Sequence, residues 1–135
     1  MVIVAIDPGE RHTGVAWLEG DKFDSATWHP NNFLPELERI LGNGGKMVLV
    51  VEEFRLYPWK SNAQRFSRMV TCEVIGVIKY LAKKYKVRLV MQKPSFVKAF
   101  ATDNKLKKVG WYTGSGHAKD AARHLYYYLE FKKWG

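Results

Sequence analysis

The sequence predicts an α/β fold in which helices flank a mixed five-stranded sheet, and three observations predict it. Short β-branched runs alternate with segments of helical periodicity along the chain. The first three runs lie too close together for a helix between them, which favours a three-strand antiparallel meander, and the later strands follow helices, which favours parallel pairing. At 135 residues the chain falls within the about 100–200 residues of a typical single core, so residues 1–135 should form one domain.

The first strand is expected over residues 2–6, a β-branched run that ends at Asp7-Pro8-Gly9. This turn sequence stops the strand and leaves Asp7 at its C-terminal tip. Residues 13–18 and 22–28 should follow as antiparallel strands, because Glu19-Gly20-Asp21 between them suits a hairpin connection.

A crossover helix and a fourth strand come next. Residues 33–41 carry apolar side chains at helical spacing and end at Gly42-Asn43-Gly44-Gly45, a run that tolerates positive φ and stops a helix. Residues 46–51 then form a continuous apolar strand that is followed by Glu52-Glu53. A carboxylate therefore emerges at the end of a second strand, as Asp7 does at the end of the first.

The C-terminal half is expected to add two more helices around a fifth strand, with a short helix and a loop between them. The segments, in order, are a loop at 54–60, a helix from 61 or 62 to 85, a strand at 87–91, a short helix at 94–100, a basic loop at 101–116 and a last helix from about 117 to 131. The apolar face of the long helix should consist of Val70, Val74, Val77, Ile78 and Leu81. Met69 and Ile75 lie beyond that stripe and indicate either a dimer surface or further core. This order of elements is that of an RNase H-like fold.

Composition favours a polyanionic partner. Lys and Arg number 22 against 13 acidic residues, and the formal net charge is +9, so nucleic acid is the first candidate and a membrane surface the second. Lysines that only keep the protein soluble are the alternative. The single cysteine, Cys72, should be a buried reduced thiol, and no run approaches the about 18 apolar residues of a membrane span, so a cytoplasmic location is expected.

Three carboxylates stand where chemistry would need them, at Asp7, Glu52 and Asp120, and His117 lies one helical turn before Asp120. Adjacent buried carboxylates repel one another unless a divalent cation neutralises them, and oxygen ligands suit Mg²⁺ or Mn²⁺. Two ions about 3.5–4 Å apart, bridged by Asp7, could hydrolyse a phosphodiester. His117 would either bind metal or transfer a proton. Each residue alone has a plainer reading, as a turn former, a surface residue or a helix cap, but together they favour a site.

These positions resemble the RuvC family of Holliday junction resolvases. The matching motifs are Ile6-Asp7-Pro8-Gly9 with Thr13-Gly14, Val50-Val51-Glu52, and His117-Ala118-Lys119-Asp120-Ala121. The resemblance implies an RNase H-like homodimer that cuts four-way junctions by Mg²⁺-dependent hydrolysis and leaves 5′-phosphates, with Asp7, Glu52, His117 and Asp120 as its catalytic tetrad. It also implies the cytoplasm of a bacterial cell or a phage-infected host, because the short chain resembles compact phage-encoded members, some of which act on a wider set of branches.

Within that resemblance the strand-end ligand is Glu52, which directly follows the apolar run, although a slip of one residue would select Glu53. Basic and aromatic residues on both sides of the site are candidates for DNA contacts. They are Arg55, Tyr57, Trp59, Lys60, Lys98, Lys105, Lys107, Lys108 and Lys119. Arg55 stands where the family has an aromatic wedge, so Phe54, Tyr57 or Trp59 would have to unstack bases.

Several alternatives stay open. A solvated loop explains the lysines of residues 105–108 equally well, and His124 should be an ordinary hydrogen-bonded or surface residue. The function could also be that of a flap nuclease, a nuclease for RNA–DNA hybrids or a non-catalytic nucleic-acid-binding module.

Overall fold

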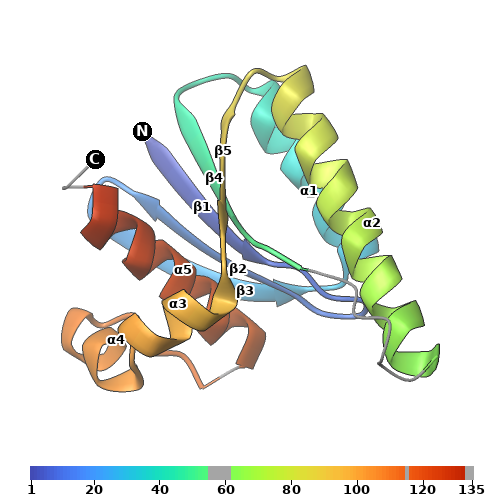
Figure 1. Cartoon of the computed structure of the whole chain (residues 1–135). Coiled ribbons are helices and arrows are strands. Elements are labelled where there is room, and N and C mark those ends of the chain that lie inside the picture. The colour runs from blue at the N-terminus through green and yellow to red at the C-terminus, as the bar shows by residue number, and fades with distance from the viewer. Residues whose placement is uncertain (55–61, 115, 133–135) are drawn as a thin grey trace.

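A computed structural model describes residues 1–54, 62–114 and 116–132, without the side chains of residues 62–69. Its five strands form one sheet in the order β3-β2-β1-β4-β5 (Figure 1). The strands are β1 (Val2–Asp7), β2 (Thr13–Glu19), β3 (Lys22–Trp28), β4 (Met47–Glu52) and β5 (Arg88–Gln92). β1, β2 and β3 pair antiparallel, whereas β4 pairs parallel with both β1 and β5. The predicted mixed sheet, a meander extended by parallel strands, is confirmed.

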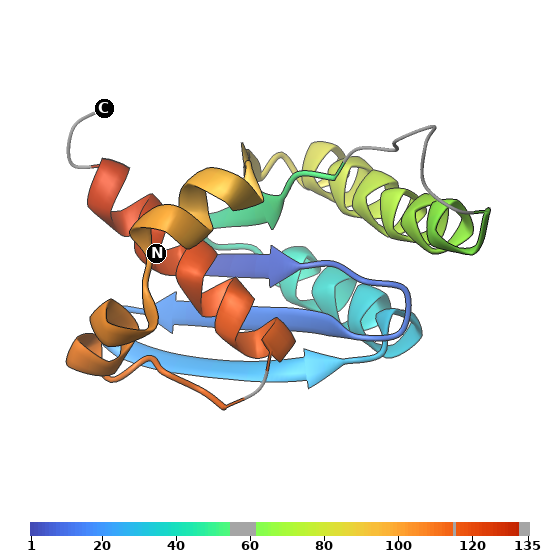
Figure 2. The same ribbon diagram turned by 60° about the horizontal axis from the view of Figure 1, so that its bottom comes forward.

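Two helical layers enclose the sheet, as Figures 1 and 2 show. The helices are α1 (Pro30–Gly42), α2 (Asn62–Lys84), α3 (Pro94–Phe100), α4 (Asp103–Val109) and α5 (Gly116–Lys132). α1 and α2 cover one face, while α5 crosses the other face beside the shorter α3 and α4. None of the described helices is both long and apolar enough to cross a membrane.

Strand alternation decides which side chains meet which layer. The face under α1 and α2 receives Val4, Ile6, Leu49 and Val51, and the face under α5 receives Ile3, Ala5, Val48 and Val50. Asp7 and Glu52 come two residues after Ala5 and Val50. The period of two therefore places both carboxylates on the α5 face, just beyond its last apolar residues.

The loop expected over residues 101–116 is a wrong prediction, because α4 occupies much of it. The Thr102 hydroxyl accepts a hydrogen bond from the backbone N–H of Lys105, and Gly110, with a φ of 78°, ends the helix. α4 buries a single apolar side chain, Leu106, so the segment lacks the repeated apolar spacing from which a helix is predicted.

The first helix starts at Pro30 rather than at residue 33. Its N-cap is His29, whose imidazole accepts a hydrogen bond from the backbone N–H of Asn31, and Pro30 occupies the first turn. Proline suits this position because its fixed φ is helical and it has no N–H to leave unpaired.

The long helix packs less simply than its predicted stripe. Val77, which was assigned to the apolar face, is 41% exposed, whereas Ile75 is buried in the core with α1. The core interpretation of Ile75 is therefore correct, and the side chain of Met69 lies outside the description. Cys72 is half-buried rather than buried.

Candidate active site

A row of polar side chains lies at the carboxyl ends of β1, β4 and β5, on the face that α5 covers. Ile6 is paired with Val51 and Glu52 is paired with Gln92, so the row reads Asp7, Glu52, Gln92 across three neighbouring strands. The side chains of Asp7 and Glu52 are each only 6% exposed. Sheet register thus fixes two buried carboxylates side by side.

α5 carries a matching polar stripe over this row. His117, Asp120 and His124 are spaced three and then four residues apart, and they therefore share one face of the helix. The close crossing depends on Gly14 in β2, where an added Cβ would lie 1.9 Å from the carbonyl oxygen of His117. No side chain fits there, so Gly14 lets the first turn of α5 reach the strand ends.

Asp7 contacts two other members of the predicted tetrad, Glu52 and His117. His117 Nδ1 lies 3.3 Å from Asp7 Oδ2, and the His117 side chain is 46% exposed. Asp120 is 26% exposed, and its Oδ1 lies 3.5 Å from Nη1 of Arg123. Although it does not touch Asp7, its negative charge contributes to raising the pKa of Asp7.

Asp7 and Glu52 hold one proton between them. Burial, followed by the hydrogen bond and the negative charge of Glu52, raises the pKa of Asp7 to about 10. Burial also acts to raise the pKa of Glu52, but the interactions with His124 and Asp7, together with the positive charge of Lys98, outweigh it and lower that pKa to about 2. At neutral pH Asp7 is therefore protonated and donates to an ionised Glu52.

This arrangement is not a closed metal centre. Within residues 1–54, 62–114 and 116–132, no three His, Cys, Asp or Glu side chains are grouped closely enough to hold a metal ion. The donor types nevertheless suit one, because a divalent cation in place of the shared proton would let both carboxylates ionise.

His124 belongs to the site, although the sequence suggested only an ordinary role for it. Its side chain is 2% exposed, Nδ1 lies 2.8 Å from Oε1 of Gln92, and Nε2 lies 3.6 Å from Oε1 of Glu52. The expectation of a hydrogen-bonded residue holds, and that of a surface residue is wrong. The signal that could have found it is its spacing, seven residues after His117 on the same helical face.

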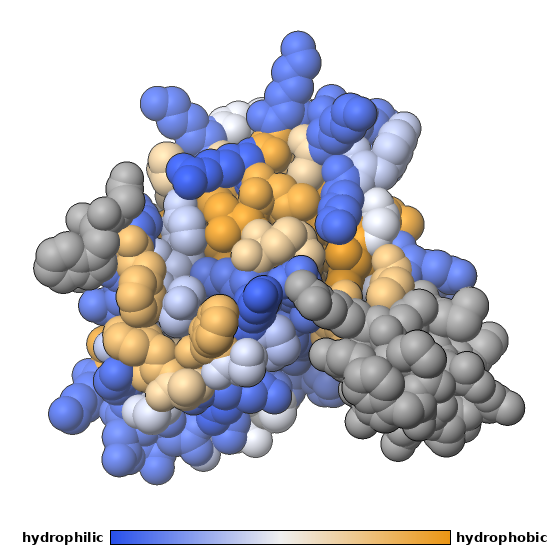
Figure 3. Space-filling view, viewed as in Figure 1, coloured by the Kyte–Doolittle hydropathy of each residue, from blue (hydrophilic) through white to orange (hydrophobic). Residues whose placement is uncertain are grey.

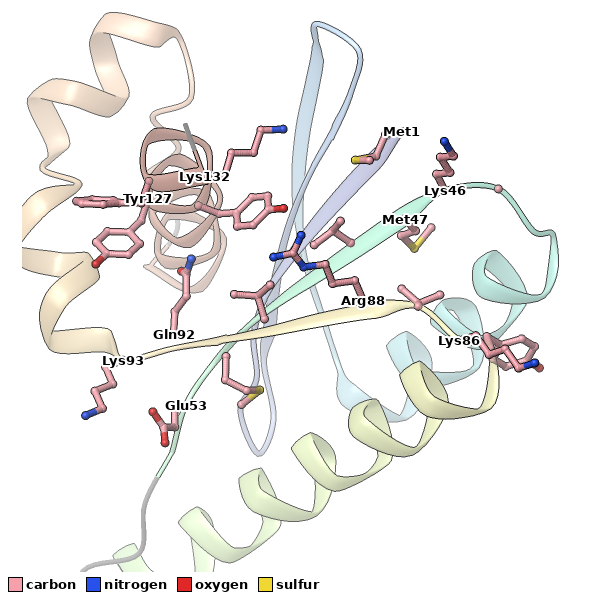
Figure 4. A pocket seen from close by; sticks show the side chains of 18 of the residues that line it. Met1, Lys46, Met47, Glu53, Lys86, Arg88, Gln92, Lys93, Tyr127 and Lys132 are labelled. Carbon is pink, nitrogen blue, oxygen red and sulfur yellow. The ribbon is translucent and has the colours of Figure 1, made fainter. Parts of the chain in front are cut away.

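The alternative carboxylate, Glu53, lies elsewhere. It lines an open groove of about 1030 Å³ along the β5 edge, together with Lys93 and Phe96, and none of the predicted tetrad lines that groove (Figure 4). Figure 3 shows the apolar floor of this region framed by hydrophilic side chains. Glu53 lies one residue beyond the end of β4, whereas Glu52 is the last residue of that strand and is hydrogen-bonded to Asp7, so the geometry favours Glu52 as the partner of Asp7.

Lys98, on α3, is a predicted DNA contact whose charge acts on the buried acids. Its side chain is exposed, and its positive charge acts to lower the pKa of both Asp7 and Glu52. Four further predicted contacts, Arg55, Tyr57, Trp59 and Lys60, lie outside the described residues.

The other predicted lysines differ in what holds them. Lys105 donates to the carbonyl oxygen of Phe100 at 2.9 Å and lies over its ring, and Lys119 pairs with Asp103 at 3.7 Å. Lys107 and Lys108 are exposed on α4. The basic segment is therefore a helix rather than a loop, and the exposure of Lys107 and Lys108 suits a solvated surface as well as DNA contacts.

Solved structures of RuvC share this architecture over its whole length. Thermus thermophilus RuvC in complex with a Holliday junction substrate aligns with a TM-score of 0.75 and 16% identity, covering 100% of this chain and 96% of that chain. The chain has the RuvC fold. A second Thermus thermophilus RuvC structure aligns with a TM-score of 0.67 and 17% identity, covering 100% of this chain and 97% of that chain. The RNase H-like expectation is thus confirmed at the level of fold, whereas no family model and no curated protein matches the sequence.

Proposed function

We propose that this chain is a Mg²⁺-dependent endonuclease that cuts branched DNA, with four-way (Holliday) junctions as its main substrate. The observation that carries the proposal is the buried Asp7–Glu52 pair, which holds one proton beneath the helix that presents His117 and Asp120. The shared fold with a RuvC bound to a junction supports the substrate, and the net charge of +9 supports nucleic acid as the partner.

Asp7, Glu52, His117 and Asp120 would hold the metal, with Mn²⁺ as a substitute for Mg²⁺. When bound, two such ions supply an activated water on one side of the phosphodiester and stabilise the leaving oxygen on the other. Asp7 contacts both Glu52 and His117, so it is the residue best placed to serve two ions at once. His117 either binds a metal through a ring nitrogen or moves a proton at Nδ1.

Basic side chains would hold the DNA backbone around this site. Lys98 acts on the acids through its charge, and Lys107 and Lys108 add exposed positive charges on α4. Cations of this kind position phosphates without reading sequence, which suits an enzyme selective for shape. Arg55, Tyr57, Trp59 and Lys60 stay sequence predictions for the same role, and a homodimer would set two sites across one junction and nick it symmetrically.

The test is cleavage of labelled four-way junction, flap, RNA–DNA hybrid and linear duplex in Mg²⁺, beside Asp7→Asn as a control that keeps binding. Paired nicks in the junction that disappear in Asp7→Asn are the expected result. Cutting of flaps or hybrids alone would redirect the substrate, and binding without metal-dependent cutting would favour a non-catalytic module.

A further inference from the structure

Two polar side chains are buried directly beside Glu52 without a place in the mechanism above. His124 is 1% exposed and Gln92 is 7% exposed. Burying an imidazole and an amide is unfavourable unless both are hydrogen-bonded, and an aliphatic residue would fill the same space at no such cost. The neighbours of His124 on the buried side of α5, Ala121 and Leu125, are indeed apolar. Packing alone therefore does not explain this pair.

His124 connects Gln92 to Glu52. Its Nδ1 lies within hydrogen-bonding distance, 2.8 Å, of Oε1 of Gln92. This bond fixes the orientation of the ring and turns its other nitrogen, Nε2, toward Oε1 of Glu52 at 3.6 Å. Gln92 is also the strand partner of Glu52 across β4 and β5. The sheet therefore fixes the two residues that His124 contacts.

We propose that His124 is a positioning residue: Gln92 orients its ring, and the ring holds the Glu52 carboxylate in line with Asp7 for metal binding. The inference rests on the proposed function, because it assigns His124 a task in the same metal site. Carboxylates that bind metals are commonly held by such outer partners, whose loss typically lowers metal affinity or activity about 10- to 100-fold.

Two substitutions of matched chemistry separate positioning from packing. In His124→Gln the side-chain amide nitrogen comes near the place of Nε2 and can still donate to Glu52. In His124→Asn the amide nitrogen comes near the place of Nδ1 and can reach only Gln92. Both replacements are polar and uncharged, so a difference between them reports the contact with Glu52.

The measurement is Mn²⁺ affinity in the absence of DNA, from the electron paramagnetic resonance signal of free Mn²⁺, with Glu52→Gln as a variant that lacks the ligand. His124→Asn should bind Mn²⁺ about 10- to 100-fold more weakly than the wild type, with His124→Gln close to wild type. His124→Asn and His124→Gln should have the same unfolding temperature, and both should bind junction equally well in EDTA. In Mg²⁺, His124→Asn should lower kcat and leave the KM for junction unchanged.

Equal Mn²⁺ affinity in His124→Asn and the wild type would overturn the inference alone. So would equal losses in both variants with lower unfolding temperatures, because that result would mean a packing role. A wild-type chain that binds no Mn²⁺ and cuts no DNA would instead overturn the proposed function, and the inference with it.

Discussion

The two halves of the candidate site are held in different ways. Asp7 and Glu52, each 6% exposed, stand at the ends of paired strands, where the sheet register sets their positions. His117 and Asp120 are 46% and 26% exposed and lie on the first turns of α5. The close approach of α5 to Gly14 of β2 brings these turns to the strand ends. The sheet register sets the strand half, whose carboxyl groups share a proton, whereas the helix half faces solvent and is the side from which the proposed metal and DNA would enter.

This difference ranks the carboxylates. Asp7 contacts Glu52 in the strand half and His117 in the helix half, so its replacement should disturb both halves. Asp120 acts on Asp7 only through its charge and is partly exposed, so water can take the place of its carboxylate. Asp7→Asn is expected to lower junction cleavage by about 10³-fold or more, on the scale of losing a group that stabilises transition-state charge. Asp120→Asn is expected to lower it less, and single-turnover cleavage in Mg²⁺ measures both. Equal losses in the two variants would remove the distinction between the halves.

Gly14 tests what places the helix half. In Gly14→Ala the new Cβ would meet backbone atoms of His117 at 1.9 Å and 2.2 Å, so α5 must shift. We expect the free energy of unfolding to fall by about 3 kcal/mol, the upper part of the usual range for overpacking, with a loss of cleavage that exceeds the loss of DNA binding. Urea unfolding and junction cleavage measure the two effects.

The control for that substitution is Gly76→Ala in α2, where an added Cβ meets nothing within 4 Å. It should stabilise the chain slightly, because alanine is the better helix former. A Gly14→Ala variant as stable as Gly76→Ala would mean that α5 is not held by this crossing.

The strand half was also the half that the sequence predicted best. Continuous β-branched runs that stop at Asp7 and at Glu52 identify buried strands and their ends, and the alternation of side chains then selects Glu52 over Glu53 once the faces are known. His117 and Asp120 were found through spacing and resemblance. Most of the fold follows from such local patterns, whereas the four proposed site residues were chosen from these patterns together with the resemblance.

What the sequence did not predict depends on contacts between distant segments. His124 becomes a site residue only because β5 brings Gln92 beside Glu52 and α5 crosses over both. The close approach at Gly14 likewise requires knowledge of how α5 lies on β2. α4 was missed for a different reason, since one buried leucine gives no periodicity.

The proton on the strand half predicts how stability depends on pH in the absence of metal. The pKa of Asp7 is raised from 3.8 to about 10 in the folded chain, so its stabilising contribution is complete below pH 3.8 and is lost as pH rises toward 10. The pKa of Glu52 is lowered to about 2, so its contribution is lost only in acid, below the ordinary value of 4.5. Between pH 5 and pH 8 only the Asp7 contribution should change.

Relative to Asp7→Asn, the wild type should therefore lose about 4 kcal/mol of unfolding free energy between pH 5 and pH 8, because the folded chain keeps one proton more than the unfolded chain over about three pH units. Urea unfolding in EDTA measures the difference, and comparison with the variant cancels the titration of groups elsewhere. Saturating Mg²⁺ should abolish it, because a cation replaces the proton. Parallel pH profiles for the two chains in EDTA would show that Asp7 is ionised in the folded state.

The smallest effect concerns Lys98, an exposed lysine of α3. Lys98 is exposed and acts on both strand carboxylates through its charge, so it should hold a phosphate near the site without holding the site together. Lys98→Ala should weaken junction binding about threefold and reduce the salt slope by about 1, with little change in stability. Lys79→Ala, an exposed lysine of α2, is the charge-matched control. Filter binding across a salt series separates the two variants, because only the loss of a lysine that contacts phosphate changes the slope of log affinity against log salt concentration. Identical slopes for Lys98→Ala and Lys79→Ala would place the DNA away from α3.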